Sequence, residues 1–185
     1  GTKLSRGANF MCLMSDTPIP SDHIYSEAQA GRMGARLMAI VAEGNRGRVY
    51  LAPTLEHEAA ANQQKTEWKP EVAMPENPRW FSPPLYGLTT YGDLFTDRQL
   101  VALTTFSDLV TEARDRIKQD ATATGLVDDG KGLEQNGKGA TAYADSVGIY
   151  LGITVSRLGN RGCTISFWDS TSQKIQQAFG RQALP

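Results

Sequence analysis

The strongest constraint on the fold of this chain is a long amphipathic stretch that begins at Thr96. Thr96 and Gln99 have the spacing of a capping box, in which each side chain accepts a hydrogen bond from the backbone N–H of the other residue. The apolar residues that follow recur every three or four positions and are Leu100, Leu103, Phe106, Val110, Ala113 and Ile117. The charged residues on the other side are Asp108, Glu112, Asp115 and Lys118. This period predicts a long helix with one apolar face that must be covered.

A second helix is predicted from about Thr141 to Leu158, where the sequence is apolar on most of the helical circumference. Its main stripe comprises Tyr143, Val147, Tyr150, Leu151, Thr154 and Leu158. Such a helix is expected at the centre of a fold. Asp145 and Arg157 interrupt the apolar run, so we interpret it as a buried helix and not as a membrane span. Asp145 is expected to bond to a neighbouring backbone or side-chain group, because a buried carboxylate needs a partner.

Shorter elements are predicted elsewhere, and the fold class is α+β, mainly helical with a small antiparallel β-hairpin. Towards the N-terminus these are a brief helix capped near Ser21 or Asp22 and ending near Gly31, then strands at 35–42 and 49–51 around a turn at 43–47. A helix over Leu55–Asn62 follows a Thr54 cap, and residues 168–170 lead into a last helix that runs through Ile175 and Phe179.

Three segments follow from this organisation: 1–62 with the hairpin, a proline-rich strap at 63–92, and a helical region at 93–185. The strap holds five prolines together with Trp68, Trp80 and Phe81. A connection of this length without regular structure suggests a segment that lies across a surface supplied by something else. Residues 125–139 contain five glycines and mixed charges, which predicts a mobile loop.

Charge balance limits how this chain could meet nucleic acid. Nineteen basic and twenty acidic residues leave a net charge of −1, so any DNA contact must come from a local patch. The candidate DNA-binding residues cluster around the predicted hairpin and are Arg32, Arg36, Arg46 and Arg48. A two-stranded ribbon can enter a DNA groove, where arginines contact phosphates or guanine edges. The alternative is a solvated hairpin face that Glu43 and Glu56 partly neutralise.

Four segments together carry a family resemblance: Gly31–Thr54, Phe95–Leu100, Gly139–Asp145 and Phe179–Pro185. They resemble the middle of the zinc-ribbon-containing, adenine-specific DNA methylases found near phage-defence genes. In that family the cofactor loop lies upstream of this region and an Asp-Pro-Pro-Tyr catalytic motif lies downstream. Neither motif occurs in these 185 residues.

The resemblance implies an internal segment of an S-adenosylmethionine-dependent, adenine-specific DNA methyltransferase of a phage-defence or restriction-modification system. The segment would be an excerpt of a larger α/β enzyme. By this resemblance S-adenosylmethionine binds the parent enzyme and not this chain alone, and no catalytic residue is expected here. The implied partners are DNA, through the parent protein, and the remaining methyltransferase halves. The competing hypothesis is a non-enzymatic DNA- or protein-binding module that uses the arginine-rich hairpin and the strap.

The resemblance also places Cys12 in the second Cys-x-x-Cys pair of a zinc ribbon. Ser15 stands where the second cysteine would be, and tetrahedral zinc needs two converging pairs. Cys12 is therefore the candidate metal ligand of an incomplete site, and an ordinary thiol is the competing interpretation. With only two cysteines, Cys12 and Cys163, a reducing cytoplasm is the expected location, without membrane association.

The segment Ser82–Tyr86 contains two prolines between a polar and an aromatic residue, as amino-methylating enzymes do around their target amine. Leu85 occupies the place of the aromatic, which displaces the stacking surface by one residue. A rigid proline turn is therefore the favoured interpretation.

Residues Gly132–Gly139 approach the pattern of a phosphate-binding loop, with Gly139 in place of the hydroxyl residue that would hold magnesium. Such a loop must follow a buried strand, and Gly125–Gly130 predicts none. A nucleotide hydrolase that depends on Lys138 is thus a third hypothesis, and a flexible linker explains the glycines better.

Overall fold

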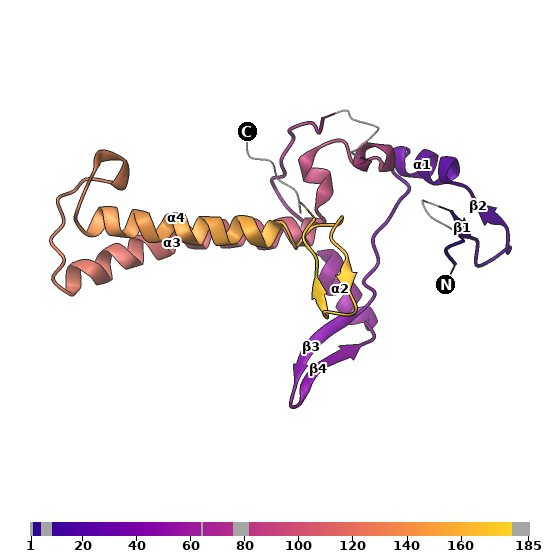
Figure 1. Ribbon diagram of the computed structural model, residues 1–185, viewed down its shortest axis with the longest axis horizontal. Helices are drawn as coiled ribbons and strands as arrows, with labels where there is room; N and C mark the ends of the chain where they lie inside the picture. The colour runs from indigo at the N-terminus through magenta and orange to yellow at the C-terminus, as the bar shows by residue number, and fades with distance from the viewer. Residues whose placement is uncertain (1, 5–8, 64, 76–81, 179–185) are drawn as a thin grey trace. The chain divides into compact units, whose positions relative to one another are not determined.

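The computed structural model describes residues 2–4, 9–63, 65–75 and 82–178 (Figure 1). Within these ranges there are four α-helices and three two-stranded antiparallel sheets, which confirms the predicted α+β class. The chain divides into two compact units. One comprises Gly1–Gln63 and Trp68–Leu94, and the other comprises Gln64–Glu67 and Phe95–Pro185.

The first unit begins with a small hairpin and a helix. Strands β1 (Phe10–Met11) and β2 (Pro18–Ile19) pair, and α1 (Ser21–Gln29) follows directly. The N-cap of α1 is Pro20 without a side-chain cap hydrogen bond, so the predicted capping role of Ser21 or Asp22 is wrong. Asp22 instead lies in the first turn, where the helix dipole favours a negative charge.

The predicted hairpin forms over a shorter range. Strands β3 (Ile40–Gly44) and β4 (Gly47–Leu51) pair around a two-residue turn. The predicted strand start at Ala35 is wrong, because Ile40 already pairs with the last residue of β4 and residues 35–39 have no strand opposite them. Helix α2 (Leu55–Gln63) follows, and the Thr54 hydroxyl accepts the His57 N–H while His57 Nδ1 accepts the Thr54 N–H at 3.1 Å. The predicted Thr54 cap is confirmed.

The strap has local structure of its own, contrary to the prediction. A short 3₁₀ helix, η1 (Pro83–Tyr86), and another, η2 (Tyr91–Leu94), lie in it, and Ala73 forms a β-bridge with Thr90. Asp93 holds the turn that leads into η2. Its carboxylate accepts the N–H groups of Thr89 and Thr90 and binds Lys69 at 3.1 Å. Burial acts to raise the pKa of Asp93, but these hydrogen bonds outweigh it and lower the pKa to about 2. Trp80 and Phe81 lie outside the described residues.

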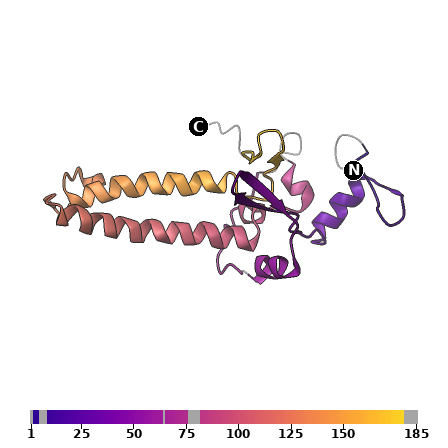
Figure 2. The ribbon, with the colours of Figure 1, turned by 90° about the horizontal axis from the view of Figure 1, so that it is seen from below.

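The second unit is built on a hairpin of two long helices, α3 (Asp97–Ala123) and α4 (Ala140–Gly159). They run side by side in both views (Figures 1 and 2). The capping box is confirmed, since Gln99 N–H donates to the Thr96 hydroxyl at 3.4 Å and Thr96 N–H donates to Gln99 Oε1 at 2.9 Å. None of the described helices combines the length and the apolarity that crossing a bilayer requires.

The prediction that α4 is central is wrong for the described structure. Tyr143 is 53% exposed and Tyr150 is 73% exposed, so much of the predicted stripe faces solvent. The face that meets α3 carries small residues instead: Ala144 is fully buried, and Gly148 and Gly159 approach Arg114 and Leu103 of α3. Small side chains allow the two helix backbones to come close, and this contact turns the larger residues outward.

The prediction of a last helix towards Phe179 is also wrong for the described residues, which end at Ala178. Strands β5 (Trp168–Asp169) and β6 (Lys174–Ile175) form an antiparallel pair there. The Asp169 carboxylate accepts the N–H groups of Thr171 and Ser172, which makes a turn in competition with a helix. Phe179 lies outside the described residues.

Candidate functional site

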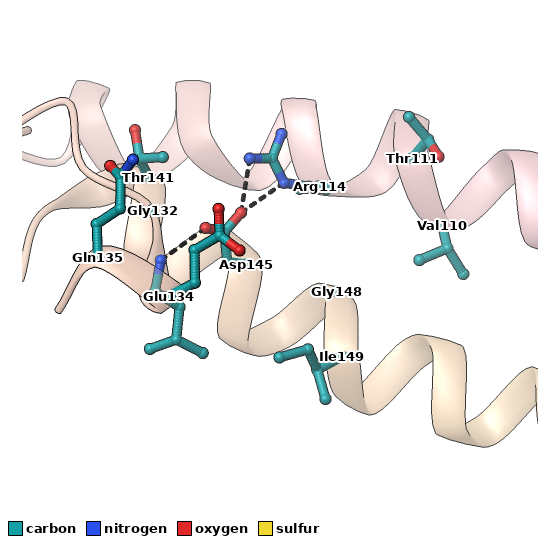
Figure 3. Close-up of a pocket in the computed structure, with 11 residues that line it drawn as sticks. Val110, Thr111, Arg114, Gly132, Glu134, Gln135, Thr141, Asp145, Gly148 and Ile149 are labelled. Atoms are coloured by element: carbon teal, nitrogen blue, oxygen red, sulfur yellow. Dashed lines mark hydrogen bonds and ion pairs between the residues drawn. The ribbon is translucent and has the colours of Figure 1, made fainter. Parts of the chain in front are cut away.

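The described part of the second unit has a groove at the tip of the α3–α4 hairpin. The connection between the helices contains the 3₁₀ helix η3 (Leu133–Gln135) and covers one side of a groove of about 750 Å³ (Figure 3). The groove is lined by Val110, Thr111, Arg114, Gly132, Leu133, Glu134, Gln135, Thr141, Asp145, Gly148 and Ile149. It therefore brings together both helices and the glycine-rich loop.

Asp145 joins all three parts of this site. Its carboxylate accepts hydrogen bonds from Arg114 Nε at 2.6 Å and from the Leu133 backbone N–H at 2.9 Å, as the dashed lines in Figure 3 show. The predicted bonding of Asp145 to neighbouring groups is confirmed. The Leu133 N–H and then the Arg114 guanidinium lower the pKa of Asp145, against the opposing effect of desolvation.

Asp128 closes the N-terminus of α4. One carboxylate oxygen accepts the Thr141 N–H at 3.0 Å, and the other accepts the Thr141 hydroxyl at 2.8 Å. Lys118 of α3 lies 3.1 Å from the same carboxylate. The hydrogen bonds from Thr141 lower the pKa of Asp128 well below its ordinary range. A carboxylate of the chain itself thus occupies the position that a bound anion would take at this helix end.

Asp129 organises the loop on its other side by accepting the backbone N–H groups of Lys131 at 3.1 Å and Lys138 at 3.0 Å. A phosphate-binding loop needs its N–H groups free for the ligand, and here carboxylates take them. The element directly before the loop is helix α3 and not the buried strand that a phosphate-binding loop follows. The nucleotide-hydrolase interpretation of Gly132–Gly139 is therefore not supported by the geometry.

The loop at 125–139, which the sequence predicts to be mobile, makes contacts with both helices in the structure. A Cβ atom at Gly139 would lie 2.6 Å from the Asp129 backbone N and 2.7 Å from the Val127 carbonyl oxygen. A Cβ at Gly137 would overlap the Lys131 carbonyl. Gly137 and Gly139 are thus needed for close backbone approach.

Several polar groups that line the groove already bond to other groups of the chain. Three charged side chains line the groove, Arg114, Glu134 and Asp145, and Arg114 and Asp145 are bound to each other. Its lining residues include Thr111, Thr141 and Glu134 but no His, Cys or Lys. Thr141 donates its hydroxyl proton to Asp128, so this hydroxyl is already engaged.

The four candidate arginines lie in the first unit, but they do not form one cluster of unpaired charges. Arg32 makes a two-point ion pair with Glu27, at 2.6 and 2.7 Å. Arg36 lies 3.8 Å from Glu58. The sequence suggested that Glu43 and Glu56 would partly neutralise these arginines. In the structure the acidic partners of Arg32 and Arg36 are Glu27 and Glu58.

The other two arginines belong to the β3–β4 ribbon. Arg48 is directly opposite Glu43 in the strand register, and Arg46 is exposed in the turn between the strands. Both residues lie in the exposed part of the ribbon.

Cys12 lies in the turn between β1 and β2, a position at which zinc-binding hairpins carry their thiolates. The hydrogen bond from Ser15 and then those from the backbone of Met14 and Ser15 lower the pKa of the Cys12 thiol. Across the described ranges, however, no group of three or more His, Cys, Asp or Glu side chains could hold a metal ion. The described residues present only the Cys12–Ser15 turn for zinc, which does not complete a tetrahedral site.

Ser82–Tyr86 forms the rigid turn that the sequence favoured. Leu85 N–H donates to the Ser82 carbonyl, and Pro83–Tyr86 is the 3₁₀ helix η1. The Tyr86 ring packs edge-on against Tyr25 of α1, with ring centroids 5.0 Å apart. This aromatic ring is thus used in packing and does not offer a free surface for a base.

Comparison of the chain with protein-family models, curated proteins and solved structures gives no match.

Sequence reasoning missed the two residues that hold the tip together, Arg114 and Asp128. In the sequence Arg114 is an ordinary charged residue of the predicted long helix. No neighbouring residue indicates that it contacts Asp145. Asp128 did carry a signal, because Asp-Asp-Gly favours a turn in which the carboxylate accepts backbone N–H groups.

Proposed function

We propose that this chain is a structural segment of an S-adenosylmethionine-dependent, adenine-specific DNA methyltransferase, which positions DNA or the catalytic parts of the enzyme and does not catalyse methyl transfer by itself. The assignment to this class depends on the four resembling segments, Gly31–Thr54, Phe95–Leu100, Gly139–Asp145 and Phe179–Pro185. The parent enzyme would bind the methyl donor and act in the cytoplasm as part of phage defence.

The observation that carries the structural role is the large apolar surface that the chain exposes. Exposed large apolar side chains occur on both strands of the ribbon, as Val41 and Val49 illustrate, and on both long helices. Surfaces of this kind are typical of segments that other protein parts cover.

The β3–β4 ribbon and α2 support the same proposal. An isolated two-stranded hairpin is only marginally stable in water. Every residue of β4 is exposed, and α2 has no buried side chain. Both elements therefore stand to gain stability by packing against protein that lies outside this chain.

Calorimetry with S-adenosylmethionine tests whether this chain binds the methyl donor by itself. We expect no saturable heat when millimolar S-adenosylmethionine is titrated into the chain, because the family's cofactor loop would be upstream. The encoding reading frame should also contain an Asp-Pro-Pro-Tyr segment downstream. A saturable one-to-one isotherm with the isolated chain would overturn the proposed role, and a reading frame that lacks the catalytic segment would overturn the assignment to this enzyme class.

The alternative function, DNA binding by the ribbon, is favoured by one specific observation: Arg46 and Arg48 lie at its exposed end. A two-stranded ribbon is narrow enough to enter the major groove of DNA. The net charge of −1 means that attraction must come from this tip and not from the whole molecule.

Removing both tip arginines tests this alternative. In Arg46→Ala/Arg48→Ala we expect the affinity for duplex DNA to fall about tenfold, and the slope of log K against log salt to become shallower by about 2, because two phosphate contacts are lost. Fluorescence anisotropy at several salt concentrations measures both quantities. Arg32→Ala is the matched control and should change the affinity by less than about twofold, since Glu27 already binds that guanidinium. Equal losses in both variants would rule out the ribbon tip as the contact.

A further inference from the structure

The β3–β4 ribbon has two chemically different faces. Residues directly opposite each other in an antiparallel pair point to the same face, and successive residues of one strand point to opposite faces. The strand register therefore assigns every residue of the two strands to one face. One face, which we call the polar face, comprises Val41, Glu43, Arg48 and Tyr50. The other, which we call the apolar face, comprises Ile40, Ala42, Gly44, Gly47, Val49 and Leu51.

All the hydrogen-bonding side chains of these two strands lie on the polar face. They are the Glu43 carboxylate, the Arg48 guanidinium and the Tyr50 hydroxyl. The apolar face of the two strands has no side chain that can donate a hydrogen bond. The faces differ in chemistry and not in exposure, because Val41 on the polar face and Val49 on the apolar face are both 43% exposed.

Duplex DNA requires donors from the surface that contacts it. Half to two-thirds of protein–DNA hydrogen bonds go to phosphates and sugars, and arginine and tyrosine side chains are among their donors. Arg48 and Tyr50 are two residues apart on β4, so they leave the same face about 7 Å apart along the strand. Arg46 in the turn continues this row of side chains towards the tip of the ribbon.

The charge of the ribbon agrees with such a contact, although Glu43 opposes it. Between Ile40 and Leu51 there are two arginines and one glutamate, which gives the ribbon a net charge of +1, whereas the whole chain has −1. Glu43 is directly opposite Arg48 on the polar face and reduces the attraction for phosphates. Removing this carboxylate is therefore expected to strengthen DNA binding if the polar face makes the contact.

We propose that the ribbon binds duplex DNA through its polar face, with Arg48 and Tyr50 directed to the phosphates and the apolar face turned away from them. A phosphate that lost its water against the apolar face would find no side-chain donor there, which costs free energy. The inference rests on DNA binding by the ribbon, the alternative function proposed above, and it adds which face makes the contact.

Adding one lysine to each face in turn tests this assignment. Val41→Lys and Val49→Lys are the same exchange at the same 43% exposure, so their effects on strand propensity are comparable. Fluorescence anisotropy with a DNA duplex at several salt concentrations is the measurement. Val41→Lys should raise the affinity about threefold at roughly 50 mM salt and steepen the slope of log K against log salt by about 1, because one phosphate contact is gained. Val49→Lys should leave the slope unchanged.

Glu43→Gln is the second variant, because it removes the charge of the polar face and keeps the shape of the side chain. It should raise the affinity about threefold at low salt, since the repulsion of a nearby phosphate is lost. Equal steepening by Val41→Lys and Val49→Lys, or wild-type affinity in Glu43→Gln, would overturn the face assignment and leave DNA binding by the ribbon intact. A wild-type chain that does not bind the duplex at low salt would overturn both.

Discussion

Gly139→Ala should lower the free energy of unfolding by about 3 kcal/mol, the upper end of the usual cost of adding a methyl group to a tightly packed site. The reason is the position of Gly139 at the N-cap of α4, where it is buried. The added Cβ would lie within 2.6–2.8 Å of backbone atoms of Asp129, Val127 and Asp128. Backbone atoms cannot turn aside as the end of a side chain can, so the loop itself must move.

Gly152→Ala is the matched control, because Gly152 lies in the middle of the same helix with nothing within 4 Å of the added Cβ. There the substitution should stabilise the chain by roughly 0.5–1 kcal/mol, through the higher helix propensity of alanine. Urea denaturation followed at 222 nm measures both changes. If the two variants changed stability in the same direction and by the same amount, the close packing of the tip loop would be disproved.

Asp128→Ala should release the tip loop from the start of α4. The carboxylate accepts the N–H and the hydroxyl of Thr141 and binds Lys118, and alanine removes all three contacts at once. We expect hydrogen exchange of the amides in the first turn of α4 to become roughly tenfold faster, since the capping interaction is lost. Amides in the middle of α3 should exchange at the wild-type rate, which makes them the internal reference.

Acid should reproduce the effect of this substitution. The folded-state pKa of Asp128 lies below its ordinary value of 3.8, so its contribution is complete above that value and is lost as the pH falls below it. In the wild-type chain the same amides should therefore exchange faster below that value, after correction for intrinsic rates, whereas in Asp128→Asn this increase should be smaller. Unchanged protection in Asp128→Ala would contradict the capping role.

The parts of the fold that the sequence predicted are those determined by neighbouring residues. The capping box at Thr96 and Gln99 depends on residues three positions apart, and it was found. The β3–β4 hairpin was also found, but its turn has two residues instead of the predicted 43–47, because Glu43, Gly44 and Gly47 are paired in the strands. The direction in which α4 packs was missed, because it depends on which of two apolar faces fits α3 more closely. Apolar periodicity identifies a helix, but it does not tell whether small or large residues will be buried.

The candidate site was missed for a related reason. The Thr141–Asp128 contact and the Arg114–Asp145 contact join residues 13 and 31 positions apart, which no local pattern encodes. At β5 and β6 the failure was of another kind, because the Asp169 turn overrode a helical apolar period. The sequence predicted an arginine cluster around the hairpin, but it did not show which of these arginines would be paired. Nothing in it indicated that Glu27 would bind Arg32 or that Glu58 would lie beside Arg36.

The ion pairs of the tip have a mechanical consequence. Arg114 and Lys118 are one turn apart on α3, and they reach Asp145 on α4 and Asp128 beside its first residue. Sliding one helix along the other by a single turn, about 5.4 Å, would break both pairs together. The two ion pairs thus hold the helices in one register at the tip of the hairpin.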